Sequence, residues 1–293
     1  MSRQMEQGPN AAGSPDAPPP LTESAGLTAA QAAHFAAFGF LHLRQLLTPE
    51  ELAAIAAAAE RAWEACLGRR PGPGEAMSIA PFIEGQRGLD TLADHPQLYG
   101  PAATLLGRDL IWGGSEGNRG VLRGRAAHEW HADREGWREL DFLRLKCMIY
   151  LEPMRREAGA LRLIPGSHRL PLHEDLASFR DRHEEEEPRY FGLSGPEVPA
   201  WAVETDPGDV VLLNQCLYHA VYGGGGRDRP YIALKYSQRP KTDAELVSVM
   251  TWSPTVFDPP EAFRRCRRAR ICGMVEGLAA LKRRAERLQS ASQ

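Results

Sequence analysis

The sequence predicts a mostly β fold with flanking helices, and three features of the chain support this prediction. After Gly107, short apolar or alternating runs are separated by Gly, Pro and Asn, which is typical of antiparallel strands joined by turns. Before Gly107 and after about residue 260, apolar residues recur at helical spacing instead. The chain also contains 28 glycines and 23 prolines in 293 residues, which is more turn-forming residues than a helical bundle uses.

The helices that precede the strands can be placed from apolar spacing and capping signals. Thr48 can cap a helix, Pro49 suits its first position, and Glu51 completes a capping box. An arginine-crowded helix is expected near the C-terminal end. The expected helices cover Leu27–Gly39, Thr48 to about Leu67, His95–Leu106 and about 260–288.

The strands are expected where apolar residues alternate or form short buried runs. Helices packed around a central β-rich segment suit a double-stranded β-helix, which is the jelly-roll of cupin-like proteins. We expect this core to cover about residues 108–240. The expected strands lie in Leu110–Trp112, Gly120–Leu122, Phe142–Leu151, Leu161–Ile164, Asp209–Leu213 and Tyr231–Tyr236.

Composition and the first residues of the chain argue against several classes of protein. The formal net charge of −3 disfavours a polybasic nucleic-acid binder, and no apolar run reaches the roughly 18 residues of a membrane helix. The five cysteines form no CxxC pair, which disfavours a disulfide framework and suits a reducing compartment. Residues 1–25 have no apolar signal-peptide core and are expected to be a disordered tail. Residues 26–293 are then a single domain of a cytoplasmic protein.

The segment His128-Glu129-Trp130-His131-Ala132-Asp133 has the strongest chemical signal. On an extended strand, residues two apart point to one side, so His131 and Asp133 can aim an imidazole and a carboxylate at one point. His219 follows a turn and a buried strand, and it is the best third ligand among the nine histidines. Two histidines and one carboxylate leave three positions of a metal open, as in non-haem Fe(II) oxygenases.

Two arginines follow the third candidate ligand. Arg227 and Arg229 are two residues apart and share a face if both lie on the incoming strand. One of them can offer a planar fork to a carboxylate inside the barrel. An oxygenase that uses 2-oxoglutarate needs such a cation for the distal carboxylate. The run of glycines at 223–226 leaves the register of the following strand open, so both arginines remain candidates.

Several ordered motifs resemble those of the phytanoyl-CoA dioxygenase family of Fe(II)/2-oxoglutarate oxygenases. Trp130-His131-Ala132-Asp133 looks like the family's WHxD metal motif, and Gly159–His168 is close to its GALRVIPGSH segment. Pro207–Val211, followed by His219-Ala220, looks like its PGD…H segment. The resemblance covers roughly residues 27–236.

The resemblance implies a hydroxylase with Fe(II), 2-oxoglutarate and O₂ as cofactor and co-substrates. It implies that His131, Asp133 and His219 bind the iron and that Arg229, or else Arg227, binds 2-oxoglutarate. The implied substrate is a small organic molecule or an acyl thioester, with release of succinate and CO₂. The carboxylate at 133 argues against the related halogenases, which have a small residue there.

Other residues are expected near this centre. Asn214 and Lys146 lie on or beside barrel strands and are expected to face the site. His128 is a candidate substrate contact, whereas His168 belongs to a structural turn. Loops at about 75–95 and 173–200 are expected to shape the pocket, and the candidate walls are Trp130, Trp112 and Tyr218.

Two alternatives stay open at the level of sequence. One is a non-catalytic jelly-roll that binds a metal or a small ligand. The other is a zinc-dependent cupin-type enzyme that uses His128, His131, Asp133 and His219. The sequence indicates neither the substrate nor the oligomeric state.

Overall fold

Two antiparallel sheets form the centre of the protein in the computed structural model, which describes residues 26–120, 127–134, 141–182, 185, 187–225 and 227–291. The large sheet contains, in spatial order, β1 (Phe40–Leu43), β10 (Val210–Asn214), β5 (Arg144–Tyr150), β12 (Tyr231–Ser237), β3 (Ile111–Arg119) and β2 (Met77–Ile79). The small sheet contains β4 (His128–His131), β11 (His219–Val221), β6 (Leu161–Leu163) and β9 (Trp201–Val203). A separate hairpin pairs β7 (Arg189–Tyr190) with β8 (Leu193–Ser194). The jelly-roll prediction is confirmed.

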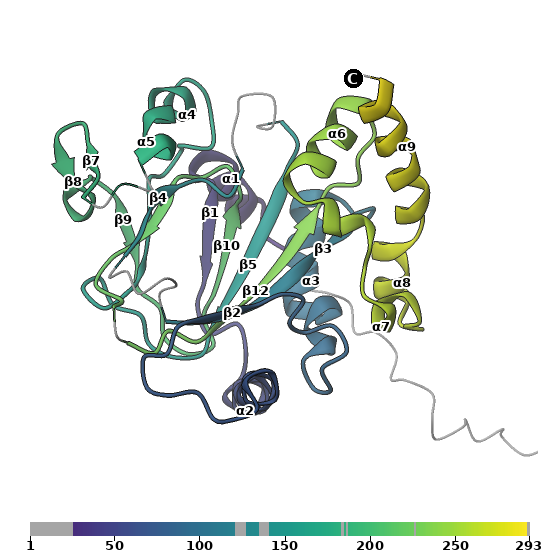
Figure 1. The fold of residues 1–293 in the computed structure, drawn as a ribbon, viewed down its shortest axis with the longest axis horizontal. Helices are drawn as coiled ribbons and strands as arrows, with labels where there is room; N and C mark the ends of the chain where they lie inside the picture. The colour runs from purple at the N-terminus through teal and green to yellow at the C-terminus, as the bar shows by residue number, and fades with distance from the viewer. Residues whose placement is uncertain are drawn as a thin grey trace, which may run out of the picture.

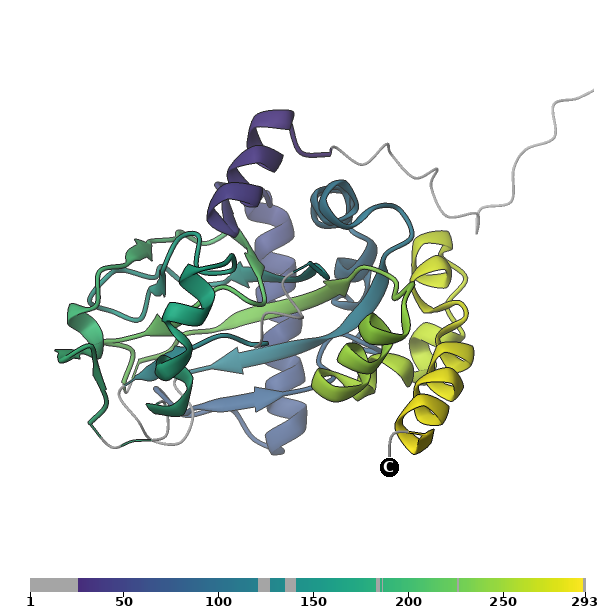
Figure 2. The same cartoon turned by 90° about the horizontal axis from the view of Figure 1, so that it is seen from above.

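Helices cover the large sheet on the side that faces away from the small sheet (Figure 1; Figure 2). The chain before the sandwich contributes α1 (Ala29–Phe38), α2 (Pro49–Leu67), η1 (Asp90–Asp94) and α3 (Pro96–Leu106). The segment between β6 and β9 contributes α4 (Leu172–Asp175), α5 (Ala177–Arg182) and η4 (Gly195–Glu197), and these lie beside the small sheet instead, where α5 contacts β4 (Figure 1). The C-terminal part contributes α6 (Asp243–Trp252), η5 (Pro254–Phe257), α7 (Glu261–Arg264), α8 (Ala269–Val275) and α9 (Leu278–Ala291).

Alternation along β5 separates the helix-covered face of the large sheet from its inner face. Leu145, Cys147 and Ile149 pack with the helices in the main apolar cluster. Met148 and Tyr150 belong instead to the cluster between the two sheets. Lys146 shares their side of the strand, because side chains two residues apart point the same way. A charged side chain is therefore directed into the sandwich.

The predicted N-terminal helices are confirmed, including the cap of α2. The Thr48 hydroxyl accepts from the Glu51 amide, and the Glu51 carboxylate accepts from the Thr48 amide. At the end of α1, Gly39 adopts φ 81°, and a Cβ there would lie 2.5 Å from His168 Nδ1. Gly39 thus lets the predicted structural turn that contains His168 pack against α1.

The C-terminal region differs from the single helix expected over about 260–288. Three helices, α7, α8 and α9, occupy it. Arg268 is extended between α7 and α8, where its guanidinium donates to the Asp90 backbone carbonyl at 2.8 Å. Gly277 has φ 74° between α8 and α9, a left-handed conformation that interrupts a helix. The helix α6 was not predicted, although Thr242 and Glu245 form a capping box there. Mostly β is therefore a loose description, because helices contain more residues than strands.

The PGD motif fixes the connection that leads into β10. Asp209 is buried and accepts hydrogen bonds from the Gln45 amide at 2.8 Å and the Asp206 amide at 3.1 Å. The ring nitrogen Nε2 of His42, on β1, lies 2.8 Å from the same carboxylate. The motif therefore joins the β9–β10 turn to β1 and stabilises this edge of the sheet.

Some predictions concern residues outside the described ranges. The expected tail 1–25 and most of the expected strand Gly120–Leu122 belong to this group. Among the described helices, none is long and apolar enough to span a bilayer.

Candidate metal and co-substrate site

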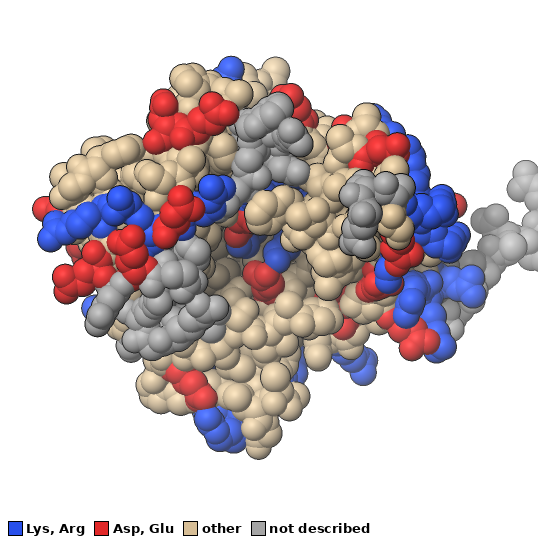
Figure 3. Space-filling model, turned by 45° about the horizontal axis from the view of Figure 1, so that its top comes forward, with Lys and Arg blue, Asp and Glu red and all other residues tan. Residues whose placement is uncertain are grey.

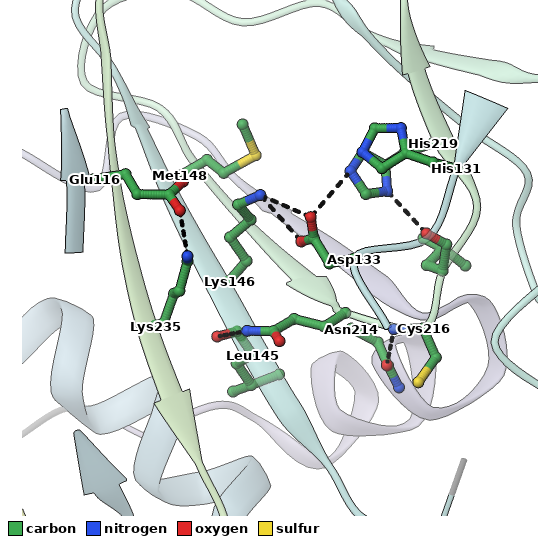
Figure 4. A network of polar contacts seen from close by, with 12 residues as sticks. Glu116, His131, Asp133, Leu145, Lys146, Met148, Asn214, Cys216, His219 and Lys235 are labelled. Carbon is green, nitrogen blue, oxygen red and sulfur yellow. Dashed lines mark hydrogen bonds and ion pairs between the residues drawn. The ribbon is translucent and has the colours of Figure 1, made fainter. Parts of the chain in front are cut away.

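The pairing of β4 with β11 brings two histidines together. His131 and His219 are register partners on these neighbouring antiparallel strands, and their ring centroids lie 4.2 Å apart. Asp133 follows two residues after the end of β4. One ligand atom from each of these three residues lies within 4.8 Å of the others. The three side chains predicted to act together are thus gathered at one point (Figure 4).

A bulge in β4 brings a further histidine to this side of the small sheet. His219 pairs with His131, but Val221 pairs with His128, so β4 has one residue more than β11 between these two pairs. An extra residue reverses the alternation, and bulges are frequent next to functional sites. His128 consequently stacks on His131, with ring centroids 4.2 Å apart. His128 itself is exposed. His128 is not one of the three clustered ligands.

Backbone carbonyls fix the tautomer of both clustered histidines. His131 Nδ1 lies 2.7 Å from the Glu129 carbonyl, and His219 Nδ1 lies 2.9 Å from the Leu217 carbonyl. Since a carbonyl only accepts, each Nδ1 carries the hydrogen and each Nε2 presents a lone pair. Burial lowers the pKa of both imidazoles, so both are neutral at physiological pH. Neutral imidazoles oriented in this way are suitable metal ligands.

The carboxylate of the cluster pairs with Lys146, which was expected to face the site. Lys146 Nζ donates to both oxygens of Asp133, at 3.1 and 3.0 Å. Burial alone would raise the pKa of the Asp133 carboxyl, but the ammonium overrides this effect and holds that pKa well below its usual value. Asp133 is therefore ionised, and the large sheet supplies the cation beside it.

A second ion pair on the inner face of the large sheet was not predicted. Lys235, on β12, donates to Glu116, on β3 (Figure 4). Burial would raise the pKa of Glu116, but Lys146 and Lys235 together lower it. The only signal in the sequence is a charged residue within each apolar or glycine-rich strand. The pairing of the two strands, which puts these residues together, cannot be read from that signal.

The two candidate arginines differ in burial and contacts. Arg229 is 3 % exposed, and its Nε donates to the Gly159 carbonyl at 2.8 Å. Its guanidinium carbon lies 5.7 Å from the centre of the Tyr231 ring. Among the residues that the structure describes, no acidic side chain pairs with Arg229. Arg227 is exposed.

Gly159 allows Arg229 to approach the backbone. Its φ is 86°, and a Cβ at this position would lie 2.5 Å from both Cδ and Nε of Arg229. The glycine at the start of the GALRLIPGSH segment is therefore required by conformation and by contact.

Asn214 lies at the end of β10 and organises the turn that leads to His219. Its side-chain oxygen accepts a hydrogen bond from the Cys216 backbone amide at 2.9 Å, and the backbone amide of Asn214 donates to the Gly39 carbonyl. A side-chain oxygen that accepts from the amide two residues later forms an Asx turn. Its contacts are thus with the backbone of the turn.

Of the three aromatic residues considered as walls, Trp112 lines a cavity, whereas Trp130 and Tyr218 pack in a core cluster. Trp112 packs in the main cluster on the helix-covered face of the large sheet. Trp130 and Tyr218 pack with Phe179 and Tyr190 in a separate cluster. All three belong to core clusters, and side chains such as Met148 lie in the cluster between the two sheets.

A hollow opens on the face of the protein shown in Figure 3, and acidic and basic side chains are visible inside it. A cavity of about 230 Å³ is lined by Trp112, Glu84, Lys235, Gly113 and Gly114, and none of the three clustered metal-ligand candidates lines it. Its other walls come from residues 80–81 and 255–260. Part of the predicted loop 75–95 therefore does line a cavity, together with a C-terminal segment that was not expected there.

Comparisons with known proteins agree with the motifs. The profile of the family described as Phytanoyl-CoA dioxygenase (PhyH) matches residues 35–223. Ectoine dioxygenase of Bordetella parapertussis is 31 % identical over 155 residues, which is 49 % of this chain and 50 % of that protein. Ectoine dioxygenase of Bordetella bronchiseptica matches equally. The chain thus spans about half the length of the curated relatives it matches.

Solved structures share the fold at low identity. HygX from Streptomyces hygroscopicus, with nickel and 2-oxoglutarate bound, is 20 % identical with a TM-score of 0.57, covering 74 % of this chain and 90 % of that chain. EctD from S. alaskensis, with 2-oxoglutarate and 5-hydroxyectoine, is 23 % identical with a TM-score of 0.54, covering 75 % and 79 %. These likenesses concern the fold.

Proposed function

Since the chain belongs to the phytanoyl-CoA dioxygenase family, we propose that it is a non-haem Fe(II)/2-oxoglutarate-dependent dioxygenase. The activity is hydroxylation of a small organic molecule, with release of succinate and CO₂. The observation that carries this proposal is the cluster of His131, Asp133 and His219, in which one ionised carboxylate and two oriented imidazoles converge within 4.8 Å.

The donor set of this cluster fits Fe(II). Two neutral nitrogens and one hard oxygen suit a divalent first-row metal and leave positions for other ligands. The hydrogen bonds of His131 and His219 to carbonyls of their own chain orient both Nε2 atoms before a metal arrives. When bound, the iron supplies the activation of O₂ that the oxidation requires. The residues hold it and keep its oxygen ligand, Asp133, ionised.

Arg229 is the residue proposed to bind the distal carboxylate of 2-oxoglutarate. Its guanidinium is buried, has no acidic partner among the described residues, and is held in place through Nε by the Gly159 carbonyl. The planar fork of arginine can then donate two hydrogen bonds to one carboxylate. Exposed Arg227 has no comparable setting. Lys146 supplies a further cation on the inner face, and Asn214 acts indirectly through the turn before His219.

The zinc alternative needs His128 as a fourth ligand, and the clustered group does not include it. The relatives named ectoine dioxygenase make ectoine one compound to test, within a wider panel of small metabolites. Purified protein with Fe(II), ascorbate and 2-oxoglutarate should release succinate when the panel is supplied. Failure to form succinate with any compound, or without one, would count against the proposal.

A further inference from the structure

Two lysines face each other on the inner side of the large sheet. Lys146 on β5 and Lys235 on β12 are direct register partners. Like charges directly opposite each other destabilise an antiparallel pair. Each ammonium group has a separate acidic partner: Lys146 pairs with Asp133, and Lys235 pairs with Glu116. The lysine side chains are only 11 % and 28 % exposed, so solvent compensates little of their charge.

The charge balance of this wall changes when the centre is loaded as proposed above. The two positive charges of Fe(II) and the one of Arg229 balance the single charge of Asp133 and the two of 2-oxoglutarate. The histidines are neutral. Among the described side chains of the inner wall, two ammonium groups then remain against the one carboxylate of Glu116. Because an uncompensated charge is costly away from water, the loaded site favours a ligand that brings one negative charge.

A cavity and partial exposure mark the strand position of Lys235. Lys235 lines the cavity of about 230 Å³ described above. Glycine at 113 and 114 leaves β3 without side chains along this stretch, and a Cβ on Gly113 would lie 2.9 Å from Lys235 Cβ. The cavity is not lined by Lys146 or Glu116, and it is the 28 % exposure of the Lys235 side chain that lets a small molecule reach the lysine pair.

We propose that Lys146 and Lys235 together bind a carboxylate of the substrate, with Glu116 as the internal counter-ion that this carboxylate displaces. The substrate class is then small carboxylic acids that are oxidised near the carboxylate, because Lys146 also contacts Asp133 of the metal cluster. This inference rests on the proposed function and specifies the substrate of the same site. Lys235 and Glu116 act as specificity-determining residues.

The test uses full-length protein loaded anaerobically with Fe(II) and saturating 2-oxoglutarate, and propionate as the probe. The measured quantity is the midpoint of thermal unfolding against propionate concentration, with propionamide as the uncharged control. Two variants have opposite expected effects. Glu116→Gln removes the competing carboxylate, whereas the double variant Lys235→Met/Glu116→Gln removes the ion pair without leaving a buried charge unpaired.

Propionate, but not propionamide, should stabilise the wild-type protein. Glu116→Gln should bind propionate more tightly, and the double variant should bind it roughly tenfold to a hundredfold more weakly, as expected for a lost hydrogen bond to a charged group. Equal binding of acid and amide, or undiminished propionate binding by the double variant, would overturn the inference.

Stabilisation by 2-oxoglutarate itself serves as the internal control. It should be the same in the wild-type protein and the double variant, since Arg229 is unchanged. Loss of this stabilisation in the double variant would mean that Lys235 binds 2-oxoglutarate rather than the substrate, and it would overturn the inference. If Fe(II) and 2-oxoglutarate fail to stabilise even the wild-type protein, the proposed function fails first, and that result is distinguishable because it does not involve propionate.

Discussion

The two sheets contribute to the site in different ways. The small sheet presents His131 and His219, and each ring is held by a carbonyl two residues earlier in its own chain. The large sheet presents Lys146 and Lys235, which are held mainly by ionic partners that lie on other segments. The first arrangement is set by local backbone geometry, and the second depends on which charges are present.

This difference indicates which half can respond to a ligand. A hydrogen bond between an imidazole and its own strand is the same before and after a metal arrives. The Lys146–Asp133 contact cannot be the same, because a metal that binds Asp133 takes over part of the charge compensation. We therefore expect changes in the small sheet to remove activity outright and changes in the large sheet to alter affinities.

The largest effect is expected from the carboxylate of the cluster. Asp133→Ala removes the one anionic donor, and two neutral imidazoles bind Fe(II) poorly. Succinate formation should fall below detection, as measured by chromatography of reaction mixtures. Glu129→Gln is a matched control, since this nearby carboxylate bonds the hydroxyls of Tyr190 and Tyr222 instead. Activity that survives Asp133→Ala would mean that the metal site is misassigned.

A large effect on co-substrate affinity is expected from the buried arginine. Arg229→Met removes charge-assisted hydrogen bonds and should raise the KM for 2-oxoglutarate roughly tenfold to a hundredfold. Arg227→Met, at an exposed position, should leave this KM within about twofold of the wild-type value. Steady-state kinetics with 2-oxoglutarate as the varied substrate gives both numbers. The reverse ranking of the two variants would assign the carboxylate to Arg227.

Two smaller effects of opposite sign are expected at Lys146: lower stability without metal and greater stabilisation by metal. Lys146→Met leaves Asp133 without its cation, so the metal-free protein should lose about 1–3 kcal/mol of unfolding free energy. Added metal then restores the missing positive charge, and the metal-induced rise in Tm should exceed that of the wild-type protein. Calorimetry with chelator and with Fe(II) measures both. Lys241→Met, at an exposed lysine, should change neither, and an equal response of the two variants would argue against the ion pair.

The smallest effect is expected away from both halves of the site, at Asp209. Its folded pKa lies below the usual value: burial opposes the shift, but amides of Gln45 and Asp206 and the His42 ring outweigh it. A depressed pKa contributes stability above the unfolded pKa of about 4, and this contribution is lost as pH falls through that value towards the folded pKa. Asp209→Asn should cost about 1–2 kcal/mol near neutral pH and flatten the acid limb of the stability curve.

Denaturant unfolding between pH 7 and pH 3 checks this prediction. Asp206→Asn is the control, because its carboxylate is exposed and pairs with Arg155 on the surface. The KM for 2-oxoglutarate should not change in either variant. A shifted KM in Asp209→Asn with unchanged stability would contradict a purely structural role for the PGD motif.

Local signals made the small-sheet half predictable from the sequence. The spacing of His131 and Asp133 is a property of one strand, and His219 follows a recognisable turn and buried strand. The face of Lys146 follows from simple alternation. The stacking of His128 on His131 was not predictable, because a bulge leaves no mark in hydrophobic alternation.

The large-sheet half depends on pairing between distant segments. Glu116 meets Lys235 only because β3 and β12 are neighbours, and the glycines at 113, 114 and 117 hide the alternation of β3. The break in the C-terminal helical region also depends on contact between distant segments. Arg268 leaves the helix to bond Asp90, which lies far away in the sequence.

We propose that one centre binds both Fe(II) and 2-oxoglutarate. An anaerobic titration tests it most directly: metal-free protein receives one equivalent of Fe(II), and then 2-oxoglutarate is added while the visible spectrum is recorded. The proposal predicts a weak charge-transfer band that saturates at one 2-oxoglutarate per chain and is missing in Asp133→Ala. No band in the wild-type protein, together with tight retention of zinc, would contradict it.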